Sequence, residues 1–146
     1  MKSAWFYALA VAALLVIAFG AHVATLDASS AKRELDLARS QTTAEGLYVA
    51  AIEPEDPGIR QGVLHSWVLT VKTADGKPVE DARIAVDGGM PDHGHGLPTR
   101  PKLRDALGDG RYVVDGMKFN MGGYWVVDLA IAAPAGEDTV RFELNL

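Results

Sequence analysis

The most prominent pattern along the chain is an uncharged, mostly apolar run over residues 4–26, which follows Lys2. About 20 apolar residues are enough for a helix to cross the hydrocarbon core of a bilayer. A basic residue followed by an apolar stretch is also typical of an export signal. The run therefore predicts a transmembrane or signal helix within residues 1–30, either an uncleaved single-pass anchor or a cleaved signal peptide. With Lys2 retained inside, the rest of the chain lies on the periplasmic or extracellular side, anchored in the cell membrane or secreted after cleavage.

A short polar segment follows the apolar run. Residues 31–41 are rich in charge, and only Leu35 and Leu37 are large and apolar. We expect a short polar helix or stalk over residues 31–45, which spaces a domain at 46–146 from the membrane.

The pattern changes after residue 45 to strand-like runs separated by Gly, Pro and Asp. The segment 64–73 alternates, and its more apolar face carries His65, Trp67, Leu69 and Val71, so we expect these to point inward. A long connection with many glycines is expected over 87–109. Strands are predicted at 46–52, 64–73, 79–86, 111–115, 123–132 and 139–146. These six runs, without helical patterns between them, predict an all-β, immunoglobulin-like Greek-key β-sandwich of about seven strands.

Two local patterns support this architecture. The segment 75–78 (Asp-Gly-Lys-Pro) is a predicted turn, with glycine where φ is positive. The segment 108–112 (Gly-Asp-Gly-Arg-Tyr) resembles a tyrosine corner, in which the phenol of Tyr112 binds the backbone of a crossover between sheets.

Composition narrows the range of functions. The net charge of −5 argues against a nucleic-acid partner, which needs a basic surface. The absence of cysteine excludes thiolate sites and disulfides. No nucleophile elbow or zinc-protease motif is present, so we do not expect an enzyme. The mean hydropathy of +0.07 averages the apolar N-terminus with an exported part of ordinary polarity.

Histidine and methionine gather in two segments of the exported part. Met90, His93 and His95 lie within six residues, and Met117 and Met121 follow at a spacing of four. Imidazole and thioether without thiolate suit copper, because thioether is a soft ligand for Cu(I) and imidazole accepts both oxidation states. Glycines on both sides of His95 let this loop fold back, and in an extended conformation His93 and His95 face the same side.

Other interpretations of these residues stay open. The histidine loop is also compatible with a solvated turn, and the methionines with filler of the core beside Phe119. His65 is either an auxiliary or outer ligand or a group that binds backbone. Arg100, Lys102 and Arg104 alternate, which is typical of a solvated edge; the alternative is a surface that docks an acidic partner.

Taken together, several of these motifs resemble the YtkA-like family, which is related to the FixH-like proteins. The resemblance covers about residues 47–146. Its motifs are His65-x-Trp67, the segment 75–82, Met90-Pro-x-His93-Gly-His95, Gly110-x-Tyr112 and Phe119-x-Met121-x-Gly123-x-Trp125.

The resemblance implies a small, N-terminally anchored, extracytoplasmic β-sandwich with a copper-related role. Its motif positions are Met90, His93, His95 and Met121, whereas Met117 is outside the motif. This chain lacks the long Met/His-rich tail of copper carriers, and FixH-like proteins differ from it in the Met-Pro-x-His-Gly-His loop.

We therefore expect a non-catalytic protein that binds copper through Met90, His93, His95 and Met121. It would carry or sense the metal and exchange it with a protein partner. The alternative is a structural or assembly module of a membrane complex, in which the glycine-rich loop is a recognition surface without metal.

Overall fold

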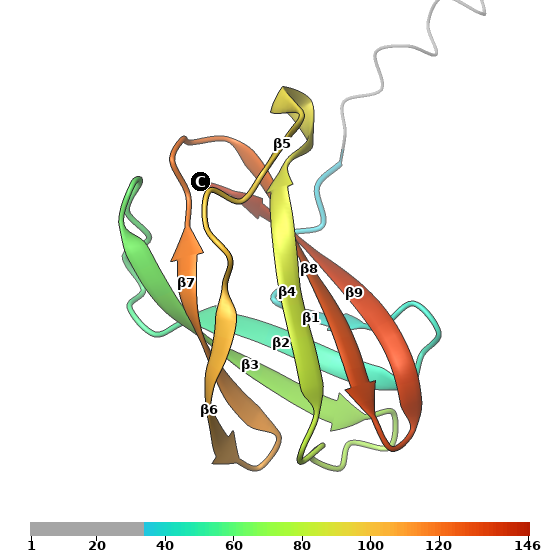
Figure 1. Cartoon of the computed structure of the whole chain (residues 1–146). Helices are drawn as coiled ribbons and strands as arrows, with labels where there is room; N and C mark the ends of the chain where they lie inside the picture. The colour runs from blue at the N-terminus through green and yellow to red at the C-terminus, as the bar shows by residue number, and fades with distance from the viewer. Residues whose placement is uncertain (1–33) are drawn as a thin grey trace, which may run out of the picture. The chain divides into compact units, whose positions relative to one another are not determined.

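The computed structural model describes residues 34–146, and the predicted anchor or signal at 1–30 lies outside the described residues. Residues Leu35–Leu146 form one compact unit. It is an all-β sandwich of two antiparallel sheets, with one short 3-10 helix among the described residues (Figure 1). No helix within residues 34–146 is both long enough and apolar enough to span a membrane.

The five-stranded sheet has the order β1-β2-β3-β7-β6, and the four-stranded sheet has the order β5-β4-β8-β9. Most of the strand pairs join strands that are consecutive along the chain, whereas the pairs β3-β7 and β4-β8 join strands that are distant in sequence. The strands are β1 (Ser40–Thr42), β2 (Tyr48–Pro54), β3 (Leu64–Thr73), β4 (Arg83–Met90), β5 (His95–Gly96), β6 (Lys102–Gly108), β7 (Arg111–Lys118), β8 (Tyr124–Ala133) and β9 (Gly136–Asn145), and η2 (Pro91–His93) is the 3-10 helix.

The alternation predicted for residues 64–73 is confirmed, because β3 has these bounds and its residues from His65 to Val71 alternate between buried and half-buried. The inward faces of both sheets share one core. At its centre the rings of Trp67 and Phe119 lie 6.2 Å apart, and those of Phe119 and Trp125 lie 5.3 Å apart at a steep angle. Such edge-on aromatic pairs add stability beyond the area they bury.

The predicted tyrosine tether is also confirmed. The buried hydroxyl of Tyr112 on β7 donates to the carbonyl of Val79 (2.6 Å) and accepts from the N–H of Ala82 (3.0 Å). Val79 and Ala82 belong to the connection that leads from β3 in one sheet to β4 in the other. Gly110 makes this approach possible, because a Cβ there would lie 2.3 Å from the carbonyl oxygen of Val71.

The structure differs from the expected elements in two places. Residues 34–39 contain no helix, and β1 follows them and pairs with β2, so the sheet begins before the expected domain boundary at residue 46. The long connection expected over 87–109 contains the end of β4, η2, β5 and all of β6. β6 was not among the predicted strands; it lies at the edge of its sheet, in agreement with the interpretation of the alternating basic residues as a solvated edge.

A buried carboxylate on β9 holds the β1–β2 loop. Burial by itself raises the pKa of Asp138, but donated hydrogen bonds oppose this effect and lower the pKa to about 2. The donors are the Thr43 hydroxyl and the backbone N–H groups of Glu45, Leu47 and Thr139. The ionised carboxylate therefore stabilises the folded state.

Replacing Asp138 should weaken the fold in a pH-dependent way. Since the folded pKa lies below the unfolded value, the stabilisation is fully present above about pH 5 and is lost as the pH falls from about 4 to 2. We expect Asp138→Asn to lower the free energy of unfolding by about 2 kcal/mol at pH 7, and by about half as much near pH 3. Urea unfolding of a 34–146 fragment across this range measures the difference.

The matched control is Glu137→Gln, on the exposed neighbour of Asp138 in the same strand. It should change the unfolding free energy by less than about 0.5 kcal/mol at any of these pH values. If wild type and Asp138→Asn differed in unfolding free energy by the same amount at pH 7 and pH 3, this role for the carboxylate would be contradicted.

Candidate metal centre

The predicted histidine loop is a tight reversal at the end of β4. Pro91 opens η2, where its fixed φ suits the first helical position. Gly94 then adopts the left-handed conformation (φ 68°), and its N–H donates to the carbonyl of Met90 (3.0 Å). The chain turns back as β5, which pairs with the end of β4 (Figure 1). This turn is called the histidine hairpin below and spans residues 89–96.

The histidine hairpin brings the two predicted imidazoles together. The ring centroids of His93 and His95 lie 5.9 Å apart, with 36° between their planes, and both residues are exposed. Their proximity does not come from an extended strand, as the sequence suggested, because His93 ends η2 and Gly94 reverses the chain before His95. Two imidazoles at this separation can approach one ion after small side-chain rotations.

Met90 lies at the base of the same hairpin. It is directly opposite His95 in the β4–β5 ladder, and side chains opposite each other in a ladder share one face of the sheet. Met90 is only 2% exposed. Its methyl carbon lies 3.4 Å from the position that a Cβ on Gly123 would occupy. The thioether side chain therefore reaches from β4 to the β7–β8 loop, which also carries Met121.

Trp125 connects the histidine hairpin to this loop. The imidazole of His95 packs edge-on against the fully buried indole of Trp125, with 6.1 Å between the ring centroids. The indole N–H of Trp125 donates to the carbonyl of Met121 (3.0 Å). The backbone of the Met121 loop is thus fixed against the residue that lies beside His95.

The two methionines of the 117–121 segment differ in environment. Met117 is buried in β7 and fills the core, whereas Met121 is 37% exposed. Met117 is therefore a core residue, as the alternative interpretation had it, and Met121 is not. This difference agrees with the assignment of Met121, and not Met117, to the candidate ligand set.

His65 has a different environment from the hairpin histidines. It is 7% exposed, and its Nε2 lies 3.1 Å from the backbone nitrogen and 3.0 Å from the backbone oxygen of Arg60. Its ring therefore holds the β2–β3 loop through the main chain, which is the second of the two roles considered for it.

The donor set limits which metals the hairpin suits. Within the described part of the chain, no three His, Asp or Glu side chains are grouped so that they could hold a metal ion. The groups present at the hairpin are the imidazoles of His93 and His95, which are borderline ligands, and the thioether of Met90 at its base, which is a soft ligand.

Gly89 is a positioning residue that the sequence did not single out. A Cβ on Gly89 would lie 2.4 Å from the carbonyl oxygen of His95 and 2.8 Å from the Cα of Gly96. Only glycine therefore lets β5 close on β4. A glycine pair at the end of a strand, just before Met-Pro, is the signal for such a close backbone approach.

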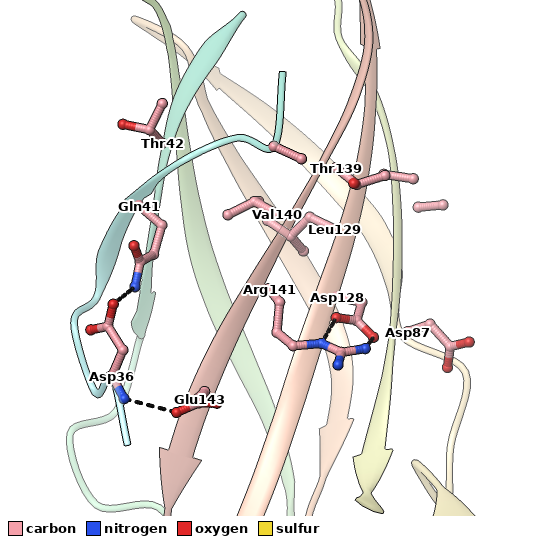
Figure 2. A pocket seen from close by; sticks show the side chains of 13 residues that line it. Asp36, Gln41, Thr42, Asp87, Asp128, Leu129, Thr139, Val140, Arg141 and Glu143 are labelled. Atoms are coloured by element: carbon pink, nitrogen blue, oxygen red, sulfur yellow. Dashed lines mark hydrogen bonds and ion pairs between the residues drawn. The ribbon is translucent and has the colours of Figure 1, made fainter. Parts of the chain in front are cut away.

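A second concave region lies over the four-stranded sheet, a hollow of about 660 Å³ with Ala85 and Ala130 among its lining residues (Figure 2). Its carboxylates already have partners. Asp128 forms a two-pronged pair with Arg141 (2.7 and 2.9 Å), and Glu143 accepts from the N–H of Asp36 (2.8 Å). These interactions stabilise the sheet face, and the hollow contains neither histidine nor methionine.

Comparison with known proteins agrees with this description. The model of one protein family, described as YtkA-like, matches residues 41–130, which is more than half of the chain. The chain belongs to the YtkA-like family. The YtkA-like match runs from β1 into β8 and includes Met90, His93, His95 and Met121. No curated protein and no solved structure matches the chain.

The geometry of this YtkA-like domain predicts that Gly89→Ala disturbs the hairpin although residue 89 bears no ligand. The added methyl group would force β5 away from β4, which should move His95 away from Trp125. In proton–nitrogen NMR spectra of a 34–146 fragment, we expect large shifts of the Trp125 indole and His95 ring signals.

Gly96→Ala is the matched control on the opposite strand, since its Cβ would meet no atom closer than the carbonyl oxygen of Gly88 at 3.4 Å. It should leave the Trp125 and His95 signals close to their wild-type positions. Equal perturbation by the two substitutions would contradict the role assigned to Gly89.

Proposed function

We propose that this protein binds one copper ion outside the cytoplasm, through the imidazoles of His93 and His95 and the thioethers of Met90 and Met121. The observation that carries the proposal is the placement of two exposed imidazoles whose ring centroids lie 5.9 Å apart, one of which, His95, lies directly across the ladder from the buried Met90. Copper would be a cargo or a signal in this role, and we do not propose catalysis.

The contrast in burial between the ligands supports a function in transfer. Met90 is held in the core, whereas the imidazoles and Met121 face solvent. Exposed ligands can be replaced one at a time by those of a partner protein, so that the ion passes on without being released. The buried thioether would be the most constant member of the set and would favour Cu(I).

The membrane assignment is part of the same proposal. We place the domain on the outer side of the cell membrane, tethered by the apolar run at residues 4–26. The length of that run and the basic residue before it support the assignment. In that compartment thiols are prone to oxidation, so thioethers are suitable soft ligands in a chain without cysteine.

We further propose that the sandwich is of the immunoglobulin-like Greek-key type. The order β2-β3-β7-β6 corresponds to strands A-B-E-D of that fold, and β4-β8-β9 corresponds to C-F-G. The tyrosine tether departs from the usual pattern, because Tyr112 lies on β7, which corresponds to strand E rather than F.

Copper titration tests the proposed function. A 34–146 fragment omits His22 and so removes one background ligand. We expect it to bind about one Cu(I) per chain in competition with a chromophoric chelator, and we expect His93→Ala combined with His95→Ala to abolish this binding. Metal affinity depends directly on these ligands because the folded hairpin positions them before the ion arrives.

The thioether arm has its own matched control. Met90→Leu and Met117→Leu each replace a buried methionine by a side chain of similar volume. Only Met90→Leu should weaken Cu(I) binding, by about tenfold or more, which corresponds to about 1.4 kcal/mol. Unchanged copper stoichiometry in the double histidine variant would overturn the site. Absence of binding by the wild type would favour the assembly module.

A further inference from the structure

Exposed apolar side chains are unevenly distributed over the sandwich. Among the described residues the large hydrophobic side chains that are exposed are Leu37, Val63, Leu64, Leu107 and Met121. Leu107 lies near the end of β6, next to the turn into β7. The other four lie at the opposite end, where β4 and β7 finish, β3 and β8 begin and the histidine hairpin projects (Figure 1).

Two loops at that end form a continuous surface. The N–H of Gly62 donates to the carbonyl of Phe119 (2.7 Å), which joins the β2–β3 loop to the β7–β8 loop. Leu64, 62% exposed, pairs in the ladder with Lys118. We call this surface, made of Val63 and Leu64, the apical apolar surface. Its apolar residues have basic neighbours in Arg60 and Lys118.

The chain enters the sandwich at the same end. The backbone N–H of Asp36 donates to the carboxylate of Glu143 (2.8 Å). Glu143 is in register with Val126, which is in register with Gly89 of the histidine hairpin. The residues before β1 therefore lie beside the end of the sheet that carries the hairpin, as the start of the described chain shows in Figure 1.

The sequence before this point limits the distance to the membrane. Eight residues separate Leu26, the last of the apolar run, from Leu35. Even fully extended they span at most about 30 Å. The ten-residue strands are themselves about 33 Å long, so an anchor in residues 4–26 would hold the apical end closer to the bilayer than the end that carries Leu107.

We propose that the apical apolar surface rests on the outer surface of the lipid bilayer. Val63 and Leu64 would contact the boundary between headgroups and acyl chains, and Arg60 and Lys118 would face anionic headgroups. Apolar side chains beside basic ones are the pattern by which proteins bind this interface. The inference rests on the proposed membrane anchor, and it places the histidine hairpin at the membrane surface.

A chain without cysteine makes the test direct, because a single introduced cysteine is the only labelling site. The full chain is reconstituted in vesicles of mixed zwitterionic and anionic phospholipid as Leu64→Cys or Leu107→Cys, each carrying a polarity-sensitive fluorophore. Both positions are exposed leucines, and neither is a candidate copper ligand. Nitroxide groups on the lipid headgroups then report the proximity of each label to the bilayer.

We expect a blue-shifted emission and several-fold stronger nitroxide quenching at residue 64 than at residue 107. Equal quenching at the two positions would overturn the proposal, because the domain would then have no preferred orientation on the bilayer. A blue shift at residue 64 that occurs only in native membranes, without lipid quenching, would also overturn it and indicate a protein partner.

The quenching experiment needs no bound copper, so it tests the membrane contact separately from the metal site. Vesicle flotation of the same samples tests the anchor, and a chain that remains in the soluble fraction overturns both the anchor and the inference. Copper titration of the Leu64→Cys chain tests the metal site alone. Normal copper binding with equal quenching would therefore reject the membrane contact and leave the copper proposal standing.

Discussion

Trp125 is the residue on which the candidate site depends most. Its indole is fully buried, packs edge-on against Phe119 at 5.3 Å, and lies 6.1 Å from the ring of His95. Its indole N–H donates a hydrogen bond to the carbonyl of Met121 (3.0 Å). One side chain thus joins the aromatic core, the histidine hairpin and the loop of Met121. A buried N–H that lost its partner would be costly, so the position of this loop is tied to the packing of the core.

A second constraint acts on the hairpin from the other side. The close approach of β5 to β4 at Gly89 fixes the backbone of His95, while the left-handed Gly94 sets the direction in which His93 emerges. The backbone of the site is therefore constrained, whereas the imidazoles remain exposed. This combination suits a site that must both select an ion and release it, because the scaffold stays in place while exposed ligands are exchanged.

The sequence predicted the parts of this fold that depend on local periodicity. The alternation of β3, the turn at 75–78 and the tether of Tyr112 were all found as expected, since each is encoded within a few neighbouring residues. The histidine hairpin was recognised as a candidate site but not as a strand pair. Its ladder has two residues, and it exists because Gly89 permits contact with Gly96, which periodicity does not reveal. β1 was missed because its short polar segment is ordered by pairing with β2. The contact between His95 and Trp125 joins residues 30 positions apart and depends on the pairing of β4 with β8.

The central claim is that sulfur from Met90 and nitrogen from the hairpin histidines share one copper ion. X-ray absorption at the copper K-edge of the Cu(I)-loaded 34–146 fragment measures both kinds of ligand directly. We expect two nitrogen scatterers near 2.0 Å together with sulfur near 2.3 Å, distances typical of imidazole and sulfur ligands of a first-row metal. The sulfur contribution should fall in Met90→Leu and persist in Met117→Leu. A copper environment of nitrogen and oxygen alone, unchanged by Met90→Leu, would contradict it.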